Sequence, residues 1–219
     1  MMKKAEENTL NRFRNGDVGL RIRLARELAD SRRRDAVSTN LIKSAKEEKG
    51  WSLSFGATLQ ELSNDFYSMD LLSEINKHSF GKLNYTIMDL GCGPGNAAKE
   101  LARATKGQAK VIGTGVKRLS SWDKTSGVDW HVLHAENIEK FIKPKSVDFI
   151  HSNLGIAHSS DLVKSVENCR KILKTGGRLL FTVDGSSYHR LNPTDLEGFK
   201  LLKFSQPNKY VWVFYLEKL

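Results

Sequence analysis

Residues 85–95 read Tyr-Thr-Ile-Met-Asp-Leu-Gly-Cys-Gly-Pro-Gly, and the rest of the chain is organised around them. Residues 85–90 are mostly apolar, which is typical of a buried strand. Glycines then occupy every second position from 91 to 95, and residues 96–106 have the spacing of a helix that ends at Gly107. Glycine permits a sharp turn or close approach of a ligand to the backbone, and helix N-termini favour anionic groups such as a carboxylate. The stretch therefore predicts a strand, a tight turn and a helix that together can hold a small ligand.

The composition indicates a soluble protein with a core large enough to need no disulfide staples. The chain has 219 residues, of which 39% are hydrophobic and 27% charged. Its apolar runs fall short of the ~20 residues that span a bilayer, and its first residues lack the apolar core of a signal peptide. We therefore expect a cytoplasmic protein without a membrane partner. Two cysteines, Cys92 and Cys169, define neither a disulfide framework nor a metal site, so we expect no metal.

The net charge of +10 is concentrated near the N-terminus, where residues 1–50 hold 13 Lys/Arg and 8 Asp/Glu. From Arg12 to Arg34 every basic residue is arginine, which binds phosphate better than lysine. This region is therefore a candidate contact for nucleic acid. Interleaved acids and the lack of an aromatic stacking platform favour the alternative, the solvated face of a helix. We expect a basic helical extension over residues 1–50 and the main domain over residues 51–219.

Segments typical of strands and helices alternate beyond the glycine turn. Strands are expected at 85–90, 109–114, 129–134, 146–152 and 178–183, with helices at 96–106 and after Ser159 or Ser160, the second ending at Gly176. A short helix is expected to begin at Asn192, and residues 201–204 and 210–216 predict a closing hairpin. Such alternation predicts an α/β fold with a doubly wound, mostly parallel sheet.

A long amphipathic helix is expected before this region. Thr58 and Glu61 have the spacing of a capping box, and apolar residues follow at steps of three and four as far as Ile75. Trp51 and Phe55 precede it, either as a lid over a ligand or as core residues beneath the helix.

The sequence Asp89–Gly95 reads D-x-G-x-G-x-G and resembles the first motif of class I S-adenosylmethionine-dependent methyltransferases. Its last glycine comes one residue too early for the dinucleotide-binding pattern. Residues 146–183 resemble the same family's fourth strand, pocket-edge loop, long helix and fifth strand, with Arg170–Gly177 in place of its R-x-L-K-x-G-G turn. The resemblance covers roughly three-fifths of the chain. It implies a Rossmann-like, seven-stranded sheet with an antiparallel C-terminal strand, and S-adenosylmethionine as the cofactor.

The resemblance also implies a set of cofactor contacts along the ends of the first four strands. The methionine end would be held by Asp89, Gly91, Cys92, Gly93 and Gly95, the ribose by Thr114 and Gly115, and the adenine by Glu136 and Asn137, while Ser152, Asn153 and Leu154 would border the pocket beside the methyl group. The sequence departs from the family where an acid usually holds the ribose, because Gly113–Val116 contains no carboxylate. A second departure is His134, which stands where the family often has aspartate.

A catalytic residue is harder to assign. His158, Tyr188 and His189 follow the fourth and fifth strands, where the pocket should open, and each is a candidate general base or simply a packing or surface residue. We expect methyl transfer by in-line displacement to an unidentified acceptor, which could be a small molecule, a protein or RNA. The alternative is an inactive methyltransferase fold that binds nucleic acid or an acidic partner through its basic arm. A nicotinamide-dependent oxidoreductase is disfavoured by the glycine spacing.

Overall fold

The computed structural model describes residues 57–122, 127–188, 190–208 and 211–219. The predicted basic extension over residues 1–50 lies outside these ranges, as do Trp51, Phe55 and His189. The expectations about those residues stay predictions. Within the described ranges, no helix combines the length and the apolar character needed to cross a membrane.

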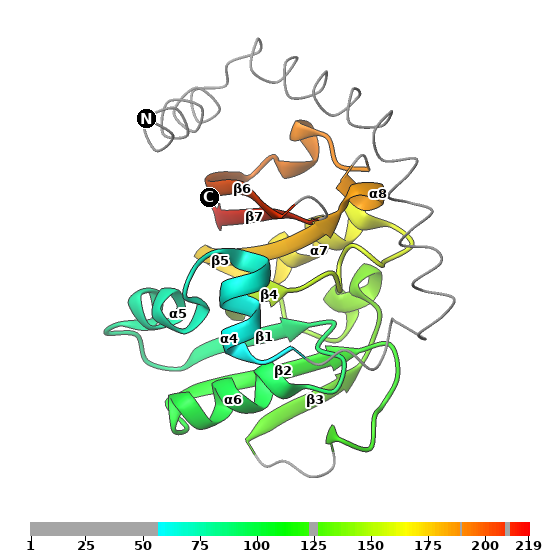
Figure 1. Cartoon of the computed structure of the whole chain (residues 1–219). Coiled ribbons are helices and arrows are strands. Elements are labelled where there is room, and N and C mark those ends of the chain that lie inside the picture. The colour runs from blue at the N-terminus through cyan, green and yellow to red at the C-terminus, as the bar shows by residue number, and fades with distance from the viewer. Residues whose placement is uncertain (1–56, 123–126, 189, 209–210) are drawn as a thin grey trace.

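A seven-stranded sheet in the order β3-β2-β1-β4-β5-β7-β6 forms the centre of the described structure. The strands are β1 (Tyr85–Leu90), β2 (Ala109–Gly115), β3 (Val128–Val132), β4 (Val147–Ser152), β5 (Leu173–Asp184), β6 (Phe199–Asn208) and β7 (Val211–Lys218). Strands β1 to β5 are parallel to one another, whereas β7 is antiparallel to its neighbours β5 and β6. The predicted doubly wound sheet and closing hairpin are confirmed (Figure 1).

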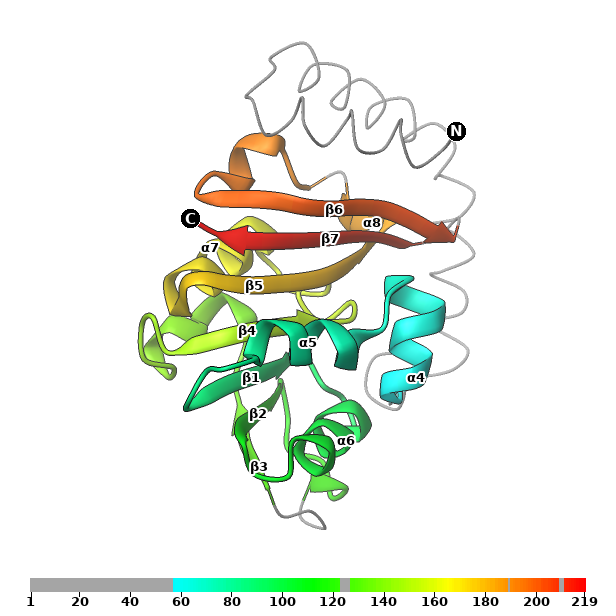
Figure 2. The same cartoon turned by 90° about the vertical axis from the view of Figure 1, so that its left-hand side faces the viewer.

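Helices cover both faces of the sheet. Figure 2 looks onto the face covered by α4 (Leu59–Glu61), η1 (Leu62–Tyr67), α5 (Leu71–Ser79) and α6 (Asn96–Thr105). The opposite face carries η3 (Ala135–Lys140), α7 (Leu162–Ile172), α8 (Gly185–Tyr188) and η4 (Pro193–Leu196). Side chains alternate along β1, so Ile87 packs into the core under α4–α6 while Met88 packs into the core under α7.

The helix predicted to run unbroken from Thr58 is three elements instead. The capping box is confirmed, because the Glu61 amide donates to the Thr58 hydroxyl at 3.2 Å and the Thr58 amide donates to the Glu61 carboxylate at 2.7 Å. A π-helix, η1, follows α4 and is capped at its C-terminal end by Ser68, whose φ is 49°. Asp70 then caps α5. Apolar spacing fits all three segments equally well, so periodicity alone did not reveal the break.

The boundaries of α7 also differ from the prediction. Its cap is Asp161, whose carboxylate accepts from the Lys164 amide at 2.9 Å, so the expected serine cap is wrong. The helix ends at Ile172 rather than Gly176, because Leu173 already pairs with Val147 of β4. A register shift follows this pairing, before Arg178 pairs with Phe149.

Candidate functional site

A cavity of about 340 Å³ opens at the carboxyl ends of β1, β2 and β4. This volume lies in the range of small-molecule sites, which run from roughly 300 to 1,000 Å³. Its position is the point where the strand order reverses, with β2 on one side of β1 and β4 on the other. The walls come from the N-terminal segment, the glycine turn, the end of β2 with the following loop, and the loop after β4.

The glycine turn between β1 and α6 forms the floor of the cavity. Gly91, Gly93 and Gly95 all have positive φ, at 80°, 52° and 79°. Gly91 and Gly93 line the cavity together with Asp89 and Cys92, whereas Gly95 does not. A Cβ on Gly95 would instead approach the Trp130 ring to 2.4 Å. The last glycine of the motif is therefore needed for packing against the protein's own aromatic side chain.

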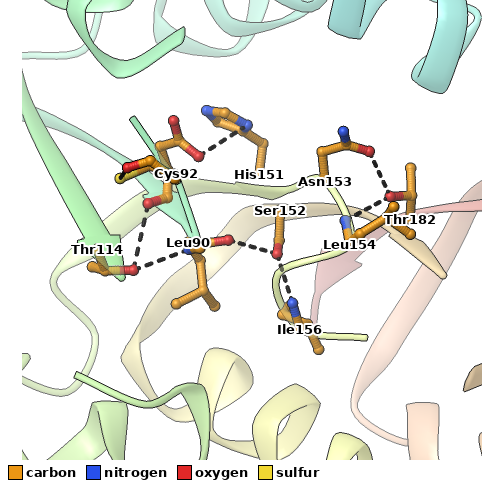
Figure 3. Close-up of polar contacts among 12 residues, drawn as sticks. Leu90, Cys92, Thr114, His151, Ser152, Asn153, Leu154, Ile156 and Thr182 are labelled. Carbon is orange, nitrogen blue, oxygen red and sulfur yellow. Dashed lines mark hydrogen bonds and ion pairs between the residues drawn. The ribbon is translucent and has the colours of Figure 1, made fainter. Parts of the chain in front are cut away.

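Thr114, at the end of β2, holds the glycine turn in place. Its hydroxyl accepts from the Gly91 amide at 3.2 Å (Figure 3). Its carbonyl accepts from the Cys92 amide at 2.8 Å. The side chain has no exposed surface and does not line the cavity. The predicted ribose contact through Thr114 therefore does not match its position here. Gly115 does line the cavity, followed by Val116, Lys117, Leu119 and Trp122, a group that contains no carboxylate.

Two stacked indoles support the turn from the β2 side. The rings of Trp122 and Trp130 lie 4.9 Å apart between centroids and are inclined by 10°. Trp122 donates through Nε1 to the Gly93 carbonyl at 2.8 Å. Trp130 lies over Gly113, where a Cβ would come within 2.3 Å of its ring. The sequence alone gives Trp122 no role in the site, whereas its contacts show that it forms part of the cavity wall.

The loop after β4 is fixed by two buried hydroxyl groups (Figure 3). The Ser152 hydroxyl donates to the Leu90 carbonyl at 2.7 Å and accepts from the Ile156 amide at 2.9 Å. The Thr182 hydroxyl donates to Asn153 Oδ1 at 2.8 Å and accepts from the Leu154 amide at 2.9 Å. Asn153 and Leu154 line the cavity as expected, whereas Ser152 is buried behind them.

The segment before β1, from Ala57 to Phe66, supplies the remaining wall of the cavity. Ala57, Leu62 and Phe66 line the cavity. The Leu59 amide donates to the Glu100 carboxylate at 2.7 Å, which fastens α4 to α6. Apolar spacing placed Leu62 and Phe66 on a buried helix face but did not connect them with the site, because the register of a π-helix cannot be read from that spacing.

Several other predicted site residues lie away from the cavity. Glu136 accepts from the Ser160 amide and hydroxyl at 2.6 and 2.7 Å. Burial raises the pKa of the Glu136 carboxyl, but the bonds from Ser160 outweigh it and hold that pKa below its usual value. Neither Glu136 nor Asn137 lines the cavity.

Tyr188 stacks on Trp212 with ring centroids 4.7 Å apart and is 8% exposed, so it occupies a core position rather than that of the proposed base. His158 does line the cavity.

Asp89 is the carboxylate that reaches the cavity among its lining residues. It is 5% exposed, and burial raises its pKa, partly offset by His151 and by the Ala98 amide. Burial and the neighbouring Asp89 raise the pKa of the Cys92 thiol, so this thiol stays protonated at neutral pH. Within the described residues, His, Cys, Asp and Glu side chains form no cluster suited to a metal ion.

Part of the chain around this cavity matches a family model. Residues 88–181 match the family model described as a methyltransferase domain, and this range begins within β1 and ends within β5. This range, less than half of the chain, is similar to a methyltransferase domain. The matched range contains the glycine turn, the end of β2 and the loop after β4, which form much of the cavity. Both the resemblance and the fold drawn from the sequence are confirmed.

One curated relative matches a short part of the chain. It is malonyl-[acyl-carrier protein] O-methyltransferase 1 of Coxiella burnetii, 49% identical over 41 residues. The match covers 19% of this chain and 14% of that protein. The shared stretch is too short a part of the relative to transfer the activity of the whole enzyme.

Solved structures share the fold at low sequence identity. A SAM-dependent methyltransferase from Aquifex aeolicus has a TM-score of 0.56 at 17% identity, covering 73% of this chain and 93% of that one. The [4+2]-cyclase SpnF has a TM-score of 0.55 at 13% identity, covering 85% of this chain and 94% of that one. The second structure shows that this architecture also serves other chemistry.

Proposed function

We propose that this chain transfers a methyl group from S-adenosylmethionine to an acceptor by in-line displacement, with the donor bound in the cavity above the glycine turn. The observation that carries the proposal is the coincidence of the cavity with the matched methyltransferase domain. Methyl transfer requires the protein chiefly to hold donor and acceptor in line and to exclude water. A half-enclosed cavity with mostly apolar walls suits that task.

The lining residues suggest how each part of the donor would be held. Asp89, at the floor, is placed to accept hydrogen bonds from the ammonium of the methionine part. Leu119 and Trp122 offer apolar surface to the nucleoside. Asn153 and Leu154 border the expected position of the methyl group. These contacts fit the donor except at the ribose, where the described walls of the cavity offer no carboxylate.

His158 remains the candidate for accepting a proton from the acceptor. It lines the cavity, follows the loop that carries Asn153 and Leu154, and is exposed to solvent. A general base must come within hydrogen-bond reach of the proton that it takes, which an acceptor bound at the mouth of the cavity would allow. The comparisons give no support to the alternative role as an inactive scaffold.

Transfer of radiolabelled methyl groups tests the proposal. The full chain is incubated with methyl-labelled S-adenosylmethionine and separate pools of small molecules, protein and RNA. We expect label to enter one pool, and to be lost with Asp89→Asn but retained with Glu167→Gln, a surface carboxylate on α7. No incorporation above the no-enzyme control in every pool, or equal incorporation by wild type and Asp89→Asn, would contradict the proposal.

A further inference from the structure

Asp89 and His151 are neighbours across β1 and β4. They are direct partners in the register of the two parallel strands, so both side chains point to the face covered by α4–α6. His151 Nδ1 lies 3.8 Å from Asp89 Oδ1. Figure 3 marks this contact with the dashed line that starts at the His151 ring. The His151 side chain has no exposed surface, whereas Asp89 reaches the cavity. The imidazole therefore lies behind the carboxylate, away from any ligand.

Tyr67 covers the imidazole from the other side. It is the last residue of the π-helix η1, and its ring meets the His151 ring edge-on, with centroids 6.5 Å apart and planes inclined by 87°. Phe66, the preceding residue, lines the cavity. The same turn of η1 therefore touches both the ligand space and the buried histidine. Single π-helical turns are frequently found at functional sites.

The side-chain polar atoms of His151 and Tyr67 have no hydrogen bonds within the described structure. Neither ring nitrogen of His151 nor the Tyr67 hydroxyl has a hydrogen-bond partner among the described residues. An unpaired buried polar group costs about 1–3 kcal/mol, so such groups in a native fold call for an explanation. His151 is a fully buried histidine on a strand, beside the carboxylate that the described residues present to the cavity. This placement indicates that His151 influences the protonation of the Asp89 carboxylate.

Few charged groups face His151 among the described residues. On β1 the facing group is Asp89, and on η1 it is Tyr67. On β5 the register partner is Leu180, which cannot ionise. The pKa of Tyr67 lies well above its usual value because of burial and the nearby Asp89, so its hydroxyl keeps its proton. Protons exchanged between Asp89, His151 and Tyr67 and the solvent therefore belong to Asp89 and His151.

We propose that His151 is a positioning residue that acts through Asp89, and that the Asp89–His151 pair releases a proton to solvent when the ammonium group of the donor binds. This inference rests on the proposed function. A positive charge brought against Asp89 favours the ionised carboxylate and disfavours the imidazolium. Groups this close titrate as a pair, so the released proton belongs to the pair rather than to one residue.

The direction in which ligand affinity changes with pH follows from the pKa shifts of Asp89 and His151. Burial raises the pKa of Asp89 and lowers the pKa of His151, which brings the two values toward each other. The bound ammonium lowers the pKa of both groups. In the pH range where the pair titrates, the ligand-free site therefore holds more protons than the ligand-bound site. Affinity for the ligand must weaken as the pH falls and be greatest where the pair is already deprotonated.

Calorimetric titration with S-adenosylhomocysteine, the demethylated product that keeps the ammonium, tests this. The full chain is titrated between about pH 5.5 and pH 8 in buffers with different heats of ionisation, which counts the protons released. We expect release to increase toward acid pH, with affinity falling up to about tenfold per pH unit, the limit for one proton. We expect His151→Asn to shift this dependence toward higher pH, because the variant lacks the imidazole charge that holds down the pKa of Asp89.

A matched control is His131→Asn. His131 also lies beside a carboxylate, 3.1 Å from Asp129, but on β3 and away from the cavity lining. We expect it to leave the proton count unchanged. Tyr67→Phe serves as a second variant if His151→Asn does not fold, and should keep the release because Tyr67 supplies no proton.

The outcomes separate this inference from the proposed function. No binding by the wild type at millimolar ligand would overturn both. Binding without proton release, or release that His151→Asn leaves unchanged, would overturn only the role of His151.

Discussion

A Cβ atom on Gly91 would lie 2.6 Å from the Cα of Gly155, so the glycine turn and the loop after β4 meet backbone to backbone. The contact is reciprocal, because a Cβ on Gly155 would lie 2.8 Å from the Cα of Gly91 and 2.4 Å from the Leu90 carbonyl oxygen. The glycine turn and the loop after β4 can therefore pack this closely only because Gly91 and Gly155 have no side chains.

Replacing Gly91 by alanine should therefore destabilise the fold more than a positive φ alone would. Gly107 is the matched control, since its φ is also 80° and a Cβ there would meet no other atom within 4 Å. We expect Gly107→Ala to cost about 1–2 kcal/mol, and Gly91→Ala roughly 1–3 kcal/mol more from overpacking. Denaturant unfolding measures both. Equal losses would show that the contact with Gly155 has no energetic weight.

The ring of Trp130 and the bare backbone of Gly113 should be energetically coupled. Gly113→Ala forces a Cβ against that ring, and we expect a loss of about 1–3 kcal/mol. In a Trp130→Leu background the smaller side chain leaves room, so the same change should cost much less. A double-mutant cycle of unfolding free energies measures the coupling, which we expect to exceed about 0.5 kcal/mol. Additive losses would contradict this packing.

Trp122 should contribute to ligand binding through its ring nitrogen. Trp122→Phe keeps an aromatic ring in the wall but removes the hydrogen bond to the Gly93 carbonyl. That bond holds the turn, and its loss should weaken S-adenosylhomocysteine binding by about 0.5–1.5 kcal/mol, or roughly two- to tenfold. Equilibrium dialysis measures the change. Unaltered affinity in a folded variant would mean that the indole nitrogen does not shape the site.

Glu136 should stabilise the fold in a pH-dependent way. Its folded pKa is lowered, so its contribution is fully present above the unfolded pKa of about 4.3 and is lost as the pH falls through the folded value. Glu136→Gln should lose about 1–3 kcal/mol at neutral pH and little in strong acid. Glu167→Gln, a surface residue of α7, should show no such dependence. A Glu136→Gln deficit that stays constant with pH would contradict the assignment.

The sequence predicted the architecture because segments typical of strands and helices alternate and are separated by turn residues. The turn at Gly91–Gly95 and the loop at Asn153 lie where the motif placed them. The break at Ser68 escaped prediction because apolar residues on both sides keep helical spacing. Thr114 was expected to contact the ribose, but its hydroxyl is bonded to the turn and its side chain does not line the cavity. Its position in the motif does not reveal that bond.

The pairing of Asp89 with His151 could not be predicted either. The two residues are far apart in the sequence, and only the register between β1 and β4 brings them onto one face. A histidine inside an apolar strand gives no sign of which group it faces. The contact of Tyr67 with His151 could not be predicted either, since it depends on the π-helical register of η1.

Calorimetric titration of the full chain with S-adenosylmethionine at neutral pH tests the central claim most directly. We expect saturable binding at one site per chain, in the micromolar range, with a marked loss of affinity in Asp89→Ala, whose carboxylate lies at the cavity floor. No heat at millimolar ligand, or binding that Asp89→Ala leaves intact, would contradict it.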